Sequence, residues 1–113
     1  MTSHWHVAVT VAGAELDSEL VRAAMVRLAQ ERPFLHAMRF ARNRAEIRYW
    51  DQADNLIDAA SLALRVWSEH QISAALPAWD VVGLEVLERE AYRRRPELGG
   101  HTIAVHHAVP QPF

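Results

Sequence analysis

The segment HWHVAVTVAG, at residues 4–13, constrains the fold most, because its side chains alternate between apolar and polar or small ones. One side of the segment carries Trp5, Val7, Val9 and Val11, and the other carries His4, His6, Ala8 and Thr10. A period of two predicts a β-strand with one face against a hydrophobic core. A strand cannot bury that face alone, so the rest of the chain must supply a sheet and a covering layer.

Two later segments have the period of a helix. Asp17 or Ser18 can cap the first, whose predicted core stripe is Leu20, Val21, Ala24, Met25 and Leu28. The second begins at Asp54 or Asn55 and ends before Pro77, with a predicted stripe of Leu56, Ala60, Ala63, Leu64, Trp67 and Ala74. Both patterns predict helices that pack on a sheet.

Two strands around a turn at 42–44 are predicted within 34–52, and a further strand within 79–90 has Val82, Leu84 and Val86 toward the core. The order of elements predicts an α+β, ferredoxin-like βαββαβ fold, with a four-stranded antiparallel sheet and two helices on one face. We expect this domain to span residues 1–90. Residues 91–113 form a C-terminal extension, in which HTIAVHHAV (101–109) is a candidate fifth strand.

The composition excludes several classes of protein. The net charge of −2 supplies no positive field, so no nucleic-acid partner is predicted. The absence of cysteine excludes disulfides and thiolate metal sites, and none of the four glycines is in a nucleotide-binding arrangement, so no cofactor is predicted. The chain has neither a signal-peptide pattern nor an apolar run of roughly 20 residues, which predicts a cytoplasmic protein with no membrane partner.

One face of the predicted sheet carries no helix, so its residues are the candidates for function. With the valines inward, they are His4, His6, Thr10, Arg39, Glu46, Arg48, Trp50, Val81, Glu85 and Leu87. Cross-strand pairs of Arg39 or Arg48 with Glu46 or Glu85 would simply solvate this face. Trp50, Val81 and Leu87, however, form an apolar group that predicts contact with a second copy of the chain. For a small-molecule ligand or a protein partner, the predicted binding residues are His6, Arg39, Arg48, Trp50 and Glu85.

No catalytic set of side chains is recognisable, so we predict a non-enzymatic homodimeric interaction or small-ligand-binding module. A metal site is an alternative, because His4 and His6 share a strand face and His106 or His107 could complete a zinc or nickel site. Surface histidines are the simpler interpretation, and no metal ligand is predicted. His70 is expected to hydrogen-bond near the end of its helix rather than act as a general base.

The segment AEIRYWDQADNLIDAASLALRVWSEHQISAALPAWDVVGLEVLERE resembles a family of small proteins of unknown function from high-GC Gram-positive bacteria, through its tyrosine-tryptophan, helical tryptophan and leucine-proline-x-tryptophan positions. The resemblance implies a bacterial, cytoplasmic protein and no particular activity. At the level of the fold the chain also looks like dimeric α/β-barrel proteins. Some of these are cofactor-independent monooxygenases or decarboxylases with His, Trp and Arg in a pocket, which His6, Arg48 and Trp50 could imitate. A small enzyme of this type is therefore the other alternative.

Overall fold

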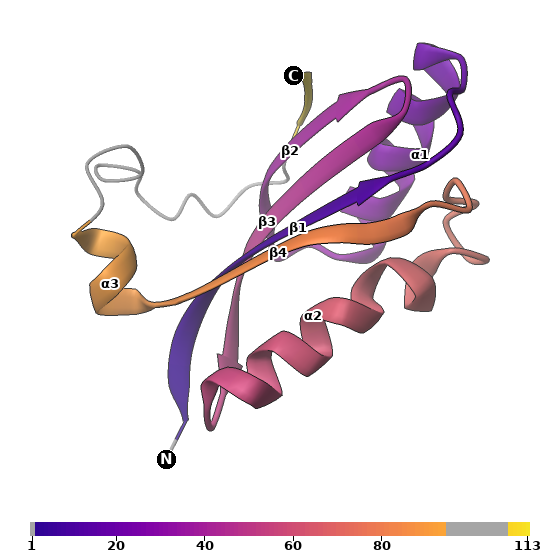
Figure 1. The fold of residues 1–113 in the computed structure, drawn as a ribbon. Coiled ribbons are helices and arrows are strands. Elements are labelled where there is room, and N and C mark those ends of the chain that lie inside the picture. Colours follow the sequence, from indigo (N-terminus) through magenta and orange to yellow (C-terminus); the bar gives the residue numbers. More distant parts are fainter. Residues whose placement is uncertain (1, 95–108) are drawn as a thin grey trace.

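The computed structural model describes residues 2–94 and 109–113 (Figure 1). The elements are β1 (Ser3–Ala12), α1 (Ser18–Glu31), β2 (Leu35–Ala41), β3 (Arg44–Ala53), α2 (Leu56–His70), β4 (Asp80–Glu88), α3 (Arg89–Arg93) and β5 (Pro110–Pro112). The first six follow the order predicted from the sequence. No helix in the described part of the chain is long and apolar enough to cross a membrane.

The sheet has five strands in the order β4-β1-β3-β2-β5. β1 pairs antiparallel with β3 and β4, and β2 pairs antiparallel with β3, but β5 runs parallel to β2. The predicted ferredoxin-like fold, with four antiparallel strands and two helices on one face, is therefore wrong, because the sheet is mixed and a third helix, α3, follows β4. The segments that form α3 and β5 are too short to show a hydrophobic period.

The candidate strand at 101–109 lies outside the described residues apart from Val109, and β5 begins just after it. A domain boundary near residue 90 stays a prediction. The elements near and after this boundary, α3 and β5, nevertheless contact the sheet. α3 packs on β1 and β4, and β5 packs on β2.

The main core lies between the sheet and the two long helices. Val7, Val9 and Val11 are buried together with side chains of α1 and α2 in one cluster, as the alternation in β1 predicts. Asp17 caps α1, because its carboxylate accepts a hydrogen bond from the amide of Glu19 at 2.8 Å.

The buried stripe of α2 differs from the predicted one. It consists of Ala59, Ala63, Val66 and Trp67, whereas Leu56 and Leu64 are about half exposed. Both stripes satisfy a helical period, and packing against the sheet selects between them. The helix also ends at His70, well before Pro77, in a turn where Ala75 has a φ of 52°.

The end of α2 is tied to α1 by polar contacts. Nδ1 of His70 lies 2.8 Å from Oε1 of Glu31, and the hydroxyl of Ser73 donates a hydrogen bond to the same oxygen at 2.6 Å. The predicted hydrogen bond of His70 near its helix end is confirmed, with a partner from a distant part of the sequence.

A β-bulge changes which residues of β4 face the core. The register of β4 against β1 shifts between Thr10 and Val11, so Val81 lies opposite Val11 and packs on the core. Val82 is 63% exposed instead. The predicted phase, with Val82 inward and Val81 on the open face, is therefore wrong at this end of the strand, because a bulge adds a residue that a strict period of two omits.

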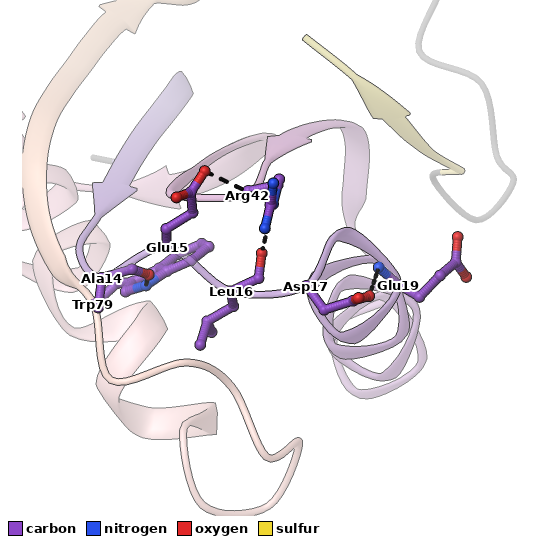
Figure 2. A network of polar contacts seen from close by, with 7 residues as sticks. All are labelled: Ala14, Glu15, Leu16, Asp17, Glu19, Arg42 and Trp79. Carbon is purple, nitrogen blue, oxygen red and sulfur yellow. Dashed lines mark hydrogen bonds and ion pairs between the residues drawn. The ribbon is translucent and has the colours of Figure 1, made fainter.

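The turn between β1 and α1 is built around Trp79. A Cβ atom at position 13 would overlap Cδ1 of Trp79, so only glycine fits there. The indole of Trp79 donates a hydrogen bond to the carbonyl of Ala14, and Arg42 donates one to the carbonyl of Leu16 (Figure 2). Arg42 thus ties the segment before α1 to the β2–β3 turn, and Trp79 ties it to the segment before β4.

Candidate functional site

The face of β1 opposite the main core carries a group of rings. The alternation of β1 places His6 on this face. The register places it between Trp50 of β3 and Leu87 of β4. Its ring centroid is 4.1 Å from that of Tyr92, 5.0 Å from His36 and 5.2 Å from Trp50. We call His6, His36, Trp50 and Tyr92 the histidine–aromatic cluster.

A register shift and a short helix assemble this cluster. The register of β2 against β3 shifts between Leu35 and Ala37, at the position that places His36 beside His6. Tyr92 is supplied by α3, which follows β4 directly and folds over this face; its ring also meets Trp50 edge-on at 4.9 Å. His6 is consequently buried completely on a face where the sequence predicts an exposed side chain.

The two histidines share one hydrogen bond. Their Nε2 atoms lie 2.8 Å apart, so one imidazole donates and the other accepts. Burial, followed by the charges of His36 and Arg48, lowers the pKa of His6 from 6.5 to about 3. Nδ1 of His6 is buried without a hydrogen-bond partner. A neutral imidazole with this pKa is too weak a base for proton abstraction near pH 7.

Arg48 lies in the next row of the sheet, opposite Ala8. Its Nε donates a hydrogen bond to Oε1 of Glu46 at 2.9 Å, but both residues belong to β3, so this is not one of the predicted cross-strand pairs. Its Nη1 is buried without a hydrogen-bond partner. Arg48 is thus a partly desolvated cation whose charge helps to keep His6 neutral.

The five predicted binding residues do not all lie together. His6, Arg48 and Trp50 are neighbours on β1 and β3, and Glu85 of β4 lies in the same row as Arg48, on the other side of Ala8. Arg39 is exposed on β2, with its guanidinium carbon 5.0 Å from the ring centroid of Phe113. The predicted apolar group of Trp50, Val81 and Leu87 is also divided, because Val81 packs on the main core and Trp50 on Tyr92.

A pocket of about 380 Å³ opens beside the cluster. It is lined by His4, Phe34, Trp50, Asp51 and Gln52. Of the predicted binding residues, only Trp50 lines this pocket. The side chain of Phe34 is 75% exposed. Its position between Pro33 and the first residue of β2 is the one sequence signal that could have pointed to this pocket.

Tyr92 and His36 were also missed by sequence reasoning. Tyr92 is an aromatic residue in an otherwise polar segment, AYRRRPE, which resembles a solvated tail. The inclusion of His36 depends on a register shift that no local pattern shows.

The histidines of β1 do not share an environment. His4 is exposed and lies 3.0 Å from the amide nitrogen of Gln52, while His6 is buried against the aromatic rings. Across residues 2–94 and 109–113, no three side chains of His, Asp or Glu lie close enough to hold a metal ion. His106 and His107 lie outside the described residues.

Fold and site together define a small α+β domain with a five-stranded mixed sheet and a histidine–aromatic cluster on the face opposite its main core. The chain belongs to DUF8830, a family of domains of unknown function, whose sequence profile matches residues 4–102. This range contains the whole cluster. No curated protein matches the chain. The bacterial origin implied by the resemblance, the cytoplasmic location and the homodimer stay predictions.

Proposed function

We propose that this domain is a non-enzymatic binding module for a small, planar and mostly apolar molecule. The observation that carries the proposal is the pocket between Phe34 and Trp50, whose volume of about 380 Å³ falls in the range of small-molecule sites. An exposed phenyl ring beside an indole offers stacking surface that is unused in the free protein.

The indole wall of the pocket is held in place before a ligand arrives. Trp50 contacts His6 and Tyr92 edge-on, at centroid distances of 5.2 and 4.9 Å. A wall that is already ordered loses little conformational entropy on binding. Asp51 and Gln52 at the rim provide polar groups that could orient a ligand.

Binding is favoured over acid–base catalysis by the position and protonation of the histidines. The enzyme alternative requires His6, Arg48 and Trp50 to border one pocket, but only Trp50 of these three residues lines this pocket. His6 is buried and neutral, so it can neither reach a ligand there nor remove a proton from it at neutral pH.

Titration of the isotopically labelled protein with indole tests the proposal. We expect saturable shifts of the Trp50 indole resonance with a dissociation constant of about 1 mM, the range for a ligand of this size. Phe34→Ala should weaken binding about fivefold, because one stacking wall is lost. Ile72→Ala, at another exposed apolar side chain, is the matched control and should change nothing. Shifts that bypass Trp50, or equal affinity in Phe34→Ala, would contradict the proposal.

A further inference from the structure

The outer edge of β2 is occupied by the segment Pro110–Phe113. Pro110, Gln111 and Pro112 pair in parallel with Met38, Arg39 and Phe40. The amide of Phe113 donates a hydrogen bond to the carbonyl of Phe40 at 3.0 Å. The interaction thus adds an extended peptide to the edge of a sheet, in the geometry of β-augmentation.

The spacing of the two prolines matches the hydrogen-bonding pattern of this edge. Successive residues of a strand direct their main-chain groups to opposite sides. Since Phe113 donates toward β2, Gln111 faces β2 as well, and positions 110 and 112 face away. Proline lacks an N–H, so the outward edge has no donor at either position. A Pro-x-Pro-aromatic segment therefore completes the sheet without offering a good new edge.

Two arginines hold the aromatic residue of the segment. The guanidinium carbon of Arg44 lies 4.4 Å from the ring centroid of Phe113, and that of Arg39 lies 5.0 Å from it. Both distances fall in the range of cation–π attraction. The β2 edge thus contacts the extended main chain and the aromatic ring of the segment, which gives Arg39 a role away from the pocket.

The segment is held in place by few contacts. Gln111 and Pro112 are exposed, and the ring of Phe113 is 39% exposed. A short strand with little buried surface opens at low cost in free energy. The site can therefore exchange its occupant while the rest of the fold stays intact.

We propose that this β2 edge is a docking site for the Pro110–Phe113 segment of a second copy of the chain. The contacts made within one chain are available without change between two chains, which makes exchange a low-cost route to a dimer. Residues 95–108 supply 14 residues between α3 and the segment, a contour length of up to about 46 Å. That length exceeds the 40 Å longest dimension of the molecule. The inference is independent of ligand binding at the Trp50 pocket.

A peptide of residues 109–113, acetyl-VPQPF-amide, tests the site on the full-length protein. In the Phe113→Ala variant we expect the peptide to shift the resonances of Met38 to Ala41 and to bind at least tenfold more tightly than to the unaltered protein, whose own segment competes. Adding Arg39→Ala and Arg44→Ala should weaken binding at least fivefold. Arg22→Ala, which removes an exposed arginine of α1, is the control. Absence of shifts at β2 in Phe113→Ala would overturn the site.

Sedimentation equilibrium between 10 µM and 1 mM tests the occupant. We expect a dimer fraction that rises with concentration, falls in Phe113→Ala and falls when an excess of the peptide is added. A strict monomer at 1 mM, or a dimer that Phe113→Ala and the peptide leave unchanged, would overturn exchange between copies. Peptide binding by a strict monomer would show that the edge serves its own chain or another protein, contrary to the proposal.

Discussion

Lowering the pH from 7 to 5 is expected to reduce the free energy of unfolding by about 2 kcal/mol through His6 alone. The pKa of His6 is about 3 in the folded protein because the imidazole is buried, against an ordinary value of 6.5 after unfolding. Between these two values the unfolded state binds more protons, so stability is present above pH 6.5 and is lost as the pH falls toward 3. Urea unfolding at several pH values measures the slope.

His6→Phe is the informative variant, because phenylalanine keeps an aromatic ring beside Tyr92 and Trp50 but cannot be protonated. We expect its stability to vary less with pH, by about 2 kcal/mol between pH 7 and 5. His4→Phe, at an exposed position on the same strand, should keep the original slope. The pKa of Glu31 is lowered by hydrogen bonds from Ser73 and His70, and its contribution is lost only below about pH 4.5, outside this window. An unchanged slope in His6→Phe would rule out the buried neutral histidine.

Trp67→Ala is expected to lower the free energy of unfolding by about 4 kcal/mol, the largest effect of any single substitution considered. Trp67 is the largest fully buried side chain of the core. Its indole donates a hydrogen bond to the carbonyl of Pro77 at 3.0 Å and stacks on Trp79 at a centroid distance of 6.2 Å. Truncation would leave a cavity and an unpaired carbonyl, and chemical denaturation followed by circular dichroism gives the loss.

Two further truncations on α2 show whether the observed orientation of the helix is correct. Val66→Ala, in the buried stripe, should cost about 2 kcal/mol. Leu64→Ala removes a half-exposed side chain and should cost less than about 1 kcal/mol, although the sequence pattern assigns it to the core. Equal losses in the two variants would contradict the packing of α2 described above.

The binding residues were predictable only in part. Alternation in β1 correctly placed His6 and Val7 on opposite faces of the strand, because polarity along a single strand reports which face meets the core. It could not show that His6 is buried, since Tyr92 and His36 come from segments about 86 and 30 residues away, respectively. The pocket was missed for a similar reason, because its wall residues Phe34, just before β2, and Trp50, in β3, are distant in the sequence. Long-range neighbours depend on register, which a bulge changes without a local signal.

The sequence by itself determined the order of the first six elements and the inward face of β1, and it narrowed the cap of α1 to Asp17 or Ser18, because polarity periods and capping depend on residues close together in the chain. Only the tertiary structure decided which stripe of α2 is buried, that Val81 rather than Val82 faces the core, and that the sheet gains a parallel fifth strand. These features depend on contacts between distant segments. Several local patterns are compatible with each of them, and packing and register select one.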